Sequence, residues 1–598
     1  MLNFFLPLIL LFIAGCSSAS FVYKNTSQVI DEENKQYQYS APWDKKMFES
    51  FYQSRKDVGE VGEVKGAIIP HHLLSGYMPA TLFDYLKKQN PSTIVLVGPN
   101  HFGRGYSNII TSDRDWKTPF GIIKTDHNLI SVISGRQLVG VDESTMKEEH
   151  SIYPLVSFIA KSLPDAKVVP IILKNNTKNQ EMDELVRVLE KELPKDAVVI
   201  SSIDFSHYQP APVSAFHDEL SEAVIKNFDF SRLSKLEIDS IPSLYVLLRL
   251  MEKFGAQKPV YEMYDNPGQT SHYSVWFGNG DRSENKTASV LFFGDMMLDR
   301  NVTERVKEND GDWLFSALAG EENRFFSGMD EVHANLEGPF ADSRRDTGKS
   351  IAFRFDPALI STLKKYNFSI FNLANNHSLD MGQAGFAESK INLEKAGIDF
   401  YGDSYGISDD ALKIKQIGGL DIAFLGLNDT FSPLPTDKIV ALIKQAEKSA
   451  DFTIVNIHWG DEYKFLKSNA RQQKLAREMI DAGADIIIGH HPHVAQEMEI
   501  YKNKPIFYSL GNFIFDQYFS TETQQGLAVG LVMCKGGACP AQSTGGAGGQ
   551  SVYVFPLQSV QSQVKLMSGD YLNSFFVQFI QNSRLGDNKF NNFNIKLN

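Results

Sequence analysis

The sequence has few cysteines, no run of basic residues and no apolar stretch long enough to cross a membrane. Only 3 of 598 residues are cysteine, so at most one pair, Cys534 and Cys539, exists besides Cys16 near the N-terminus. The formal net charge of -13 and the absence of a Lys/Arg-rich run exclude an ordinary nucleic-acid binder, because contact with phosphates requires a basic face. We therefore expect neutral or cationic partners, or partners reached through a metal ion.

The N-terminus, MLNFFLPLILLFIAGCSSAS, is typical of a signal peptide. Its apolar core, from Phe4 to Ala14, is shorter than the ~20 residues that span a bilayer. The ending Ile13-Ala14-Gly15-Cys16 resembles the lipobox of bacterial lipoproteins, whose cysteine is lipid-modified after cleavage. The resemblance implies an exported protein anchored by Cys16 to a bacterial membrane, on its periplasmic or extracellular face. An ordinary signal peptide with a chance cysteine is the alternative.

Cys534 and Cys539 have C-x4-C spacing around two glycines. In an oxidising compartment this spacing favours a short-loop disulfide. A metal site is the weaker interpretation, because the histidines gather elsewhere.

Apolar runs alternate with amphipathic stretches from about residue 61 onward, which predicts an α/β fold with largely parallel strands. The polar segment GNGDRSENKTAS (278–289) divides these runs into two α/β domains. The predicted organisation is a signal peptide (1–15), a tether with a leading helix (16–60), a first domain (61–280), a second domain (285–535) and a Gly-rich loop with C-terminal strands that complete the second domain (536–598).

In the second half, polar residues cluster directly after the apolar runs. They are Asp295, Asn335, Glu337, Asn375, Asn376, His377, His458, Glu462, His490, His491 and His493. Because the carboxyl ends of parallel strands share one edge of a sheet, these side chains can converge. Carboxylate, amide and imidazole ligands suit Zn, Mn or Fe, and two such ions could share a bridging carboxylate.

The motifs GDMMLDR, NLEGP, NLANNHSLDMG, HWGDEY, GHHPHV and YSLGNFIFDQ resemble the CapA family of poly-γ-glutamate capsule-synthesis proteins, over roughly 288–530. The family has the calcineurin-like metallophosphoesterase fold, an αββα sandwich. The resemblance implies one or two metal ions. Its implied ligands are Asp295, Glu337 as the bridging acid, Asn376, His458, His491 and His493.

The same resemblance implies catalytic roles for His377 and Asp295. A water between two ions would lose its proton near neutral pH and attack, while His377 protonates the leaving oxygen. Two positions depart from the phosphoesterase pattern: Met297 stands where the pattern has histidine, and Glu337 where it has aspartate.

In GHHPHV, Pro492 disfavours the helical region for His491 and predicts an extended conformation there. His490 is expected to support the ligands rather than bind the metal.

Polar residues also follow apolar runs in the first half. They are His71, His72, Asn100, His101, Asp204 and His207. Glu149 and His150 open an apolar segment at a predicted helix start, where the dipole favours an acid. Several imidazoles with a carboxylate could form a facial site of the kind associated with non-haem iron. The alternative is that GPNH and SH are turn sequences.

The segments GAIIPHH, VLVGPNHFGRG, EEHSIYPLVSFI, VVISSIDFSHY and SHYSVWFG resemble the Memo-like family, also called AmmeMemoRadiSam system protein B, over about 61–280. The family fold is similar to that of class III extradiol dioxygenases. The resemblance implies His71, His101, Asp204 and His207 as pocket residues around one metal ion, with the choice between His71 and His72 open. A cysteine found in some relatives is missing here.

Together these features predict a lipid-anchored protein of the cell envelope. Its second domain is expected to act on an envelope polymer or a small molecule, as a metal-dependent hydrolase or transferase. The alternative is a non-catalytic scaffold that binds polymer or metal. For the first domain a further hypothesis is a non-haem iron redox enzyme.

Overall fold

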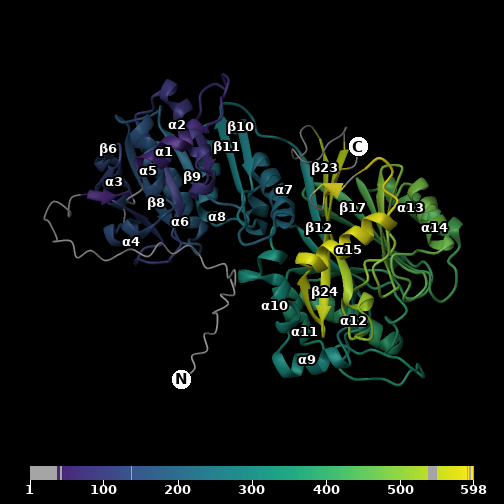
Figure 1. Ribbon diagram of the computed structural model, residues 1–598. Coiled ribbons are helices and arrows are strands. Elements are labelled where there is room, and N and C mark those ends of the chain that lie inside the picture. Colours follow the sequence, from purple (N-terminus) through teal and green to yellow (C-terminus); the bar gives the residue numbers. More distant parts are fainter. Residues whose placement is uncertain are drawn as a thin grey trace, which may run out of the picture. The chain divides into compact units, whose positions relative to one another are not determined.

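The computed structural model describes residues 37–40, 44–135, 138–536, 548–588, 590–591 and 594–596 (Figure 1). The predicted signal peptide with Cys16 lies outside these residues, as does Cys539. Cys534 is disulfide-bonded and buried at the end of a strand. Within the described ranges, no helix combines the length and the apolar character that a membrane span requires.

Residues 44–278, called the first region below, form a mixed sheet covered by helices on both faces. Four central strands pair in parallel in the order β8-β3-β9-β2. They are β2 (Gly66–Ile69), β3 (Thr93–Pro99), β8 (Lys167–Leu173) and β9 (Val198–Ser202). Outer strands are β4 (Ile109–Thr111), β5 (Asp115–Thr118), β6 (Gly121–Thr125), β7 (Val139–Val141), β10 (Lys258–Asp265) and β11 (His272–Gly278).

Strand β3 shows why both faces are covered. Ile94 and Leu96 pack into one apolar cluster, and Val95 and Val97 pack into another on the opposite face. The first cluster includes α1 (Lys45–Gln53), α2 (Tyr77–Gln89) and α5 (Tyr153–Ser162). The second includes α3 (His127–Ser134), α6 (Asn179–Glu192), α7 (Ala211–Asn227) and α8 (Ile241–Lys253), while α4 (Glu143–Glu148) lies before α5. Side chains alternate between two buried faces, as expected of a sheet between helical layers.

Residues 286–596, called the second region, contain two sheets. The β12 sheet runs in the order β15-β14-β13-β12-β23-β24, and the β18 sheet in the order β16-β17-β18-β19-β21-β20. Strands of the β12 sheet are β12 (Lys286–Met296), β13 (Glu331–Leu336), β14 (Phe368–Asn372), β15 (Asp399–Tyr401), β22 (Asn512–Ile514), β23 (Gln525–Lys535), β24 (Gly548–Val560), β25 (Gln563–Leu566), β26 (Phe590–Asn591) and β27 (Asn594–Lys596). Strands of the β18 sheet are β16 (Leu412–Ile417), β17 (Leu420–Asn428), β18 (Phe452–His458), β19 (Ile486–His490), β20 (Met498–Tyr501) and β21 (Lys504–Phe507).

The two sheets pack face to face with helices outside. Alternate residues of β12, such as Val290 and Phe292, share a cluster with Ile422 and Phe424 of β17. The outer face of the β12 sheet packs on α9 (Asn301–Asn309), α10 (Trp313–Ala319), α11 (Leu359–Lys365) and α12 (Gly382–Ala396). The outer face of the β18 sheet packs on α13 (Thr436–Glu447) and α14 (Ala470–Asp481), and α15 (Gly569–Asn582) joins the inner cluster. This layering confirms the predicted α/β class and the αββα sandwich.

Strands β12, β13 and β14 are parallel, and so are β17, β18 and β19. In each sheet their carboxyl ends therefore lie at one edge. The register of β12 against β13 shifts between Phe293 and Asp295. At the intervening Gly294 a Cβ atom would lie 1.9 Å from the carbonyl oxygen of Gly511. Only glycine permits this approach, which brings the backbone before β22 beside Asp295.

Candidate metal centres

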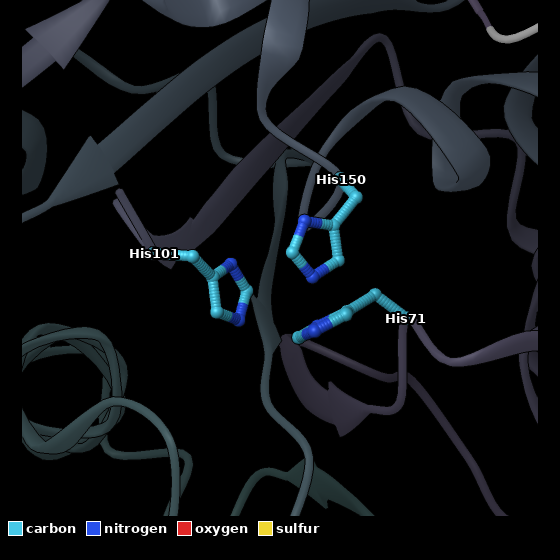
Figure 2. Close-up of side chains that lie close together, drawn as sticks. All are labelled: His71, His101 and His150. Atoms are coloured by element: carbon cyan, nitrogen blue, oxygen red, sulfur yellow. The ribbon is translucent and has the colours of Figure 1, made fainter. Parts of the chain in front are cut away.

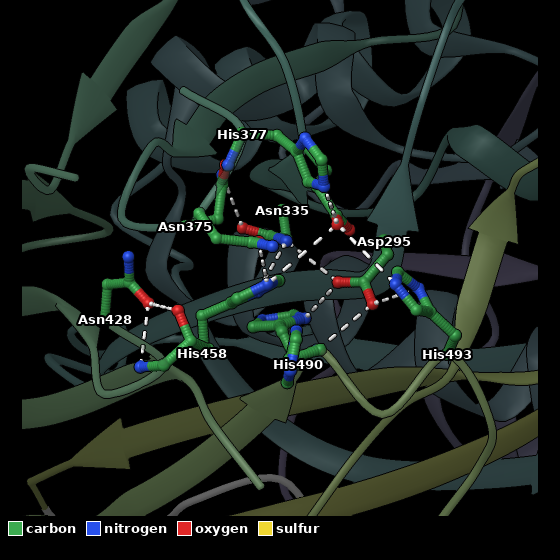
Figure 3. A network of polar contacts seen from close by, with 12 residues as sticks. Asp295, Asn335, Asn375, His377, Asn428, His458, His490 and His493 are labelled. Carbon is green, nitrogen blue, oxygen red and sulfur yellow. Dashed lines mark hydrogen bonds and ion pairs between the residues drawn. The ribbon is translucent and has the colours of Figure 1, made fainter. Parts of the chain in front are cut away.

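The second region collects its predicted site residues at the adjoining edges of the two sheets (Figure 3). From the β12 sheet come Asp295 on β12, Asn335 on β13, Glu337 after β13, and the Asn375-Asn376-His377 segment after β14. From the β18 sheet come His458, which ends β18, His490, which ends β19, and then His491 and His493. Every second-region residue that was predicted to bind a metal ion or to take part in catalysis lies in this group.

Glu337 is the centre of the group. Its side chain is fully buried, and neither carboxylate oxygen has a hydrogen-bond partner. The Nε2 atoms of three imidazoles surround Oε1: those of His377 and His458 at 3.9 Å, and that of His493 at 3.8 Å. Burial, followed by repulsion from Asp295 and other carboxylates, raises the pKa of Glu337 well above its usual value.

These distances suit side chains that share a cation. The distances of 3.8 to 3.9 Å are too long for hydrogen bonds. They are close to the spacing of about 3.4 Å between two ligand atoms that each lie about 2.1 Å from one tetrahedral ion. A buried carboxylate without a partner is costly, and a metal ion would remove that cost. Two adjacent triads have ligand atoms within 4.8 Å of one another: Asp295, Glu337 and His458, and Glu462, His491 and His493. The donor set therefore fits one or two ions.

Asp295 is held by donors from both sheets. Asn335 Nδ2 donates to Oδ1 at 2.8 Å, and the backbone N–H of His491 donates to Oδ2 at 3.1 Å. The Nδ1 atoms of His490 and His493 each lie 3.5 Å from one of its oxygens. Although burial favours the neutral acid, these contacts hold the pKa of Asp295 below its usual value. The carboxylate is thus fixed and ionised.

His458, His491 and His493 are neutral at physiological pH. Burial, followed by neighbouring imidazoles, holds the pKa of His458 well below its usual value. Burial likewise lowers the pKa of His491 and of His493 to about 4. Asn376 Oδ1 lies 2.8 Å from His458 Nε2, so the amide oxygen also faces the centre. A neutral imidazole is the form that binds a metal ion.

Asp380 orients His377, a role that the sequence analysis missed. Asp380 Oδ2 lies 2.6 Å from His377 Nδ1 and also accepts the backbone N–H of Phe353 at 2.7 Å. Its other oxygen accepts from Lys349 Nζ at 2.7 Å. The contact with Asp380 directs His377 Nε2 toward Glu337. The available signal was an acid three residues after the histidine in NNHSLD.

The structure corrects the predicted conformation of His491. Its φ is +95°, and that of His493 is +57°, so the residue before Pro492 is not extended. The hydrogen bond from its backbone N–H to Asp295 holds this disfavoured geometry. His490 contacts Asp295 as a supporting group, whereas Glu462, which was noted but not assigned, joins His491 and His493. Met297 packs in the apolar core outside the ligand group.

The first region contains a second convergence of imidazoles. Figure 2 shows His71, His101 and His150 pointing toward one another, and their ligand atoms lie within 4.8 Å. The rings of His101 and His150 are stacked with centroids 4.0 Å apart. His72 is exposed and stacks on His272 at 5.8 Å instead, so the structure places His71 in the group. The sequence predicts a helix start at His150 but no role for it in binding a metal ion.

Two aspartates complete this second group. His71 Nε2 lies 3.2 Å from Asp204 Oδ2 and 3.4 Å from Asp239 Oδ2, and Asp239 Oδ1 has no partner. Asp239 was missed because it lies in the loop before α8 and follows no apolar strand. His207 is in neither triad: its Nδ1 has no partner, and burial lowers its pKa to about 4. These donors fit one ion.

Glu149 fixes His101. Its carboxylate lies 2.7 Å from His101 Nδ1 and accepts the backbone N–H of His101 at 2.9 Å and that of Ser151 at 2.9 Å. Burial opposes the charged imidazole, but Asp239 and Glu149 outweigh it and raise the pKa of His101 to about 10. A metal ion at His101 would have to displace that proton.

Comparisons with known proteins divide the chain in the same way. Residues 35–271 match the family model "Memo-like protein", and residues 289–517 match "Bacterial capsule synthesis protein PGA_cap". "PGA biosynthesis protein CapA" of Bacillus subtilis (strain 168) is 36% identical over 265 residues, which cover 41% of this chain and 68% of that protein.

Two further relatives agree. "Capsule biosynthesis protein CapA" of Bacillus anthracis is 34% identical over 256 residues, 39% of this chain and 61% of that protein. A MEMO1 family protein of Pyrobaculum aerophilum is 31% identical over 224 residues, 36% of this chain and 80% of that protein. The chain therefore belongs to two families, the Memo-like proteins through its first region and the CapA-type capsule synthesis proteins through its second.

Proposed function

We propose that the second region is a metal-dependent hydrolase or transferase that acts in the synthesis or processing of a capsular or other envelope polymer. The observation that carries the proposal is Glu337, a buried carboxylate without a hydrogen-bond partner, faced by three imidazole nitrogens at 3.8 to 3.9 Å. The names of the CapA relatives support the link to capsule synthesis.

The residues divide into metal-holding and proton-holding groups. Asp295, Glu337, Asn376, His458, His491 and His493 would hold Zn, Mn or Fe. When bound, such ions lower the pKa of water and polarise the bond to be broken. Asp380 accepts the Nδ1–H of His377, so Nε2 faces the centre and, when the ring is doubly protonated, can give its proton to a leaving oxygen.

The test is metal analysis of the full chain and of Glu337→Gln after reconstitution with Mn, Zn or Fe. We expect the variant to hold about one or two fewer ions per chain, because Glu337 belongs to one triad and lies 3.8 Å from His493 of the other. Glu499→Gln is the control, since it alters another buried carboxylate, one paired with Arg477 and Arg584. Equal metal content in all three proteins would contradict Glu337 as a ligand, and turnover by Glu337→Gln equal to that of the wild type would show that the reaction does not depend on it. Absence of turnover by the metal-loaded wild type would leave the non-catalytic scaffold as the better account.

We infer that the first region holds one metal ion. The supporting observation is the convergence of His71, His101 and His150 beside Asp204 and Asp239. An Fe(II) ion there would make the region a candidate redox enzyme. His150→Ala should lose this ion, whereas His127→Ala, at an exposed histidine paired with Asp113, should retain it. Fe(II) absorption and elemental analysis measure the result, and failure of the folded wild type to bind Fe(II) would exclude the iron enzyme.

We also propose export and lipid anchoring through Cys16, supported by the N-terminal motif. Labelled fatty acid should enter the wild type and not Cys16→Ser. Labelling of neither protein would contradict the anchor.

A further inference from the structure

Two pairs of exposed aromatic side chains border the metal centre of the second region. Tyr405 and Phe431 are 56% and 45% exposed, and their rings stack with centroids 4.8 Å apart. Tyr463 and Phe519 are 45% and 67% exposed and meet edge to face at 5.3 Å. Among the described residues of the second region, no other aromatic side chain is exposed to this degree. Clustered exposed rings indicate a binding surface.

The first pair is connected to the centre through Lys349. Its Nζ lies 5.8 Å from the centre of the Phe431 ring and donates to the carbonyl oxygen of Asn376 at 2.7 Å. Ser404, next to Tyr405, donates to the carbonyl oxygen of Asn375 at 2.8 Å. The loops that carry Tyr405 and Phe431 are therefore connected, through Ser404 and Lys349, to the segment that carries Asn376 and His377.

The second pair is connected through His493. The Tyr463 and His493 rings stack with centroids 6.1 Å apart, and the Tyr463 backbone N–H donates to Pro492 at 2.8 Å. Gln517 Nε2 donates to the Tyr463 hydroxyl at 3.3 Å. In Figure 3, His493 and Asn428, which precedes Phe431 by three residues, lie on opposite sides of Asp295 and His458. The first ring pair therefore lies beside the Asn375-Asn376 segment of the centre, and the second lies beside His493.

The basic side chains near the centre are already paired with acids. Arg300 pairs with Asp516, Arg344 with Asp299 at 2.5 Å, and Lys349 with Asp380 at 2.7 Å. Three further carboxylates, Asp295, Glu337 and Glu462, face the metal positions. One or two divalent ions would do little more than neutralise these acids. Such a site has little positive charge left for a polymer with one carboxylate on every residue.

We propose that Tyr405 with Phe431, and Tyr463 with Phe519, are sugar-binding subsites beside the metal centre, so that the substrate is a neutral or weakly charged glycan. The C–H faces of a pyranose ring carry partial positive charge and pack on the negative face of an aromatic ring. Each pair fixes one ring against another, which limits the ordering cost on binding. A γ-linked glutamate chain offers neither a ring nor the right charge. The inference rests on the proposed function in taking this centre as the reacting site.

The test is titration calorimetry of the full chain with chitohexaose, cellohexaose, a disaccharide fragment of peptidoglycan, and γ-linked hexaglutamate. We expect at least one glycan to bind and hexaglutamate not to bind. Removing either pair, in Tyr405→Ala/Phe431→Ala or in Tyr463→Ala/Phe519→Ala, should weaken glycan binding about tenfold. Tyr405→Phe and Phe431→Tyr, which keep the rings, should bind like the wild type. Tyr106→Ala is the control, because Tyr106 is a fully exposed ring of the first region.

Binding of hexaglutamate alone, of no glycan, or of glycan at wild-type affinity by both double variants would overturn the proposal. Metal content and circular dichroism of each variant verify that the centre and the fold are intact. The two proposals fail separately. A chain that holds no metal but binds glycan through the rings contradicts only the metal-dependent enzyme, and a metal-loaded chain that binds only hexaglutamate contradicts only the glycan.

Discussion

The orientation of the His377 ring depends on Asp380, a carboxylate that does not itself take part in the proposed reaction. Asp380 is fully buried and lies 2.6 Å from His377 Nδ1, which leaves Nε2 facing Glu337. A second carboxylate behind an imidazole fixes its ring and raises its basicity. Asp380 therefore affects proton transfer by His377 without contacting the reacting atoms.

Asp380→Asn should lower kcat about 10- to 100-fold while the metal content stays at the wild-type level. The neutral amide is a weaker acceptor for the ring Nδ1–H, so the ring is held less firmly. Steady-state kinetics from pH 5 to 9 with parallel elemental analysis measure both. Asp356→Asn, which alters an exposed acid that accepts the backbone N–H of Ala358, should change neither kcat nor metal content. Loss of metal in Asp380→Asn would show that Asp380 supports the ligands instead.

His491 is under backbone strain at φ +95°. Glycine adopts this φ without penalty, so His491→Gly should be more stable than His491→Ala by about 1 kcal/mol in metal-free protein, although both lose the imidazole. Urea unfolding measures the difference. At Lys444, inside α13, the same two substitutions should rank the other way, because glycine weakens a helix. Equal stability of the two His491 variants would show that the turn relaxes.

Single residues were predictable wherever a polar side chain ends a buried strand. Asp295, His458 and His491 follow that pattern. Asp239 and Asp380 do not, because they reach their imidazoles from loops whose course depends on tertiary packing. The conformation of His491 was wrongly predicted since a local proline rule was outweighed by a hydrogen bond to Asp295, a residue distant in sequence.

At the scale of elements, the alternation of apolar runs predicted parallel strands with a common edge, and β12, β13 and β14 confirm it. The pairing partners of each strand could not be predicted from short stretches of sequence. Strand β12 also pairs antiparallel with β23, with Lys286 opposite Lys535. Such pairing follows from how two sheets close on one core, and no short pattern in either strand encodes it.

The approach of β12 to the segment before β22 makes a testable demand on Gly294. In Gly294→Ala the new Cβ would meet the Gly511 carbonyl oxygen at 1.9 Å, so the backbone beside Asp295 must move. We expect a loss of about 1–3 kcal/mol in unfolding free energy, together with weaker metal binding. Denaturant titration and metal analysis measure these effects. Gly59→Ala, where nothing lies within 4 Å of the new atom, should be neutral, and an equally neutral Gly294→Ala would contradict the close approach.

At the scale of the whole molecule, Asp218 on α7 links stability to pH. Burial is the main reason that its pKa is raised to about 7, and Tyr264 donates to its Oδ2 at 3.0 Å. Since the folded pKa exceeds the unfolded value, this contribution is complete below about pH 4 and is lost as pH rises through 7. The unfolding free energy should therefore fall between pH 5 and pH 8.

Asp218→Asn should flatten that dependence, which amounts to at most about 1.4 kcal/mol per pH unit for one proton. Unfolding free energies at pH 5 and pH 8 measure the change. Asp281→Asn, at an exposed loop position, should keep the wild-type slope. An unchanged slope in Asp218→Asn would mean that another group titrates.

The ligands of the second-region centre come in equal number from both layers of the sandwich: Asp295, Glu337 and Asn376 from one, and His458, His491 and His493 from the other. A bound ion would link the two layers, and its binding energy would add to the stability of the fold. Chelation should lower the Tm of the wild type and change the Tm of Glu337→Gln little, as calorimetry can measure. An equal shift in both proteins would contradict this link between the layers. A cell starved of transition metal would then lose more than activity: the loosened protein would become a substrate for proteases, so metal supply would set how much of it survives.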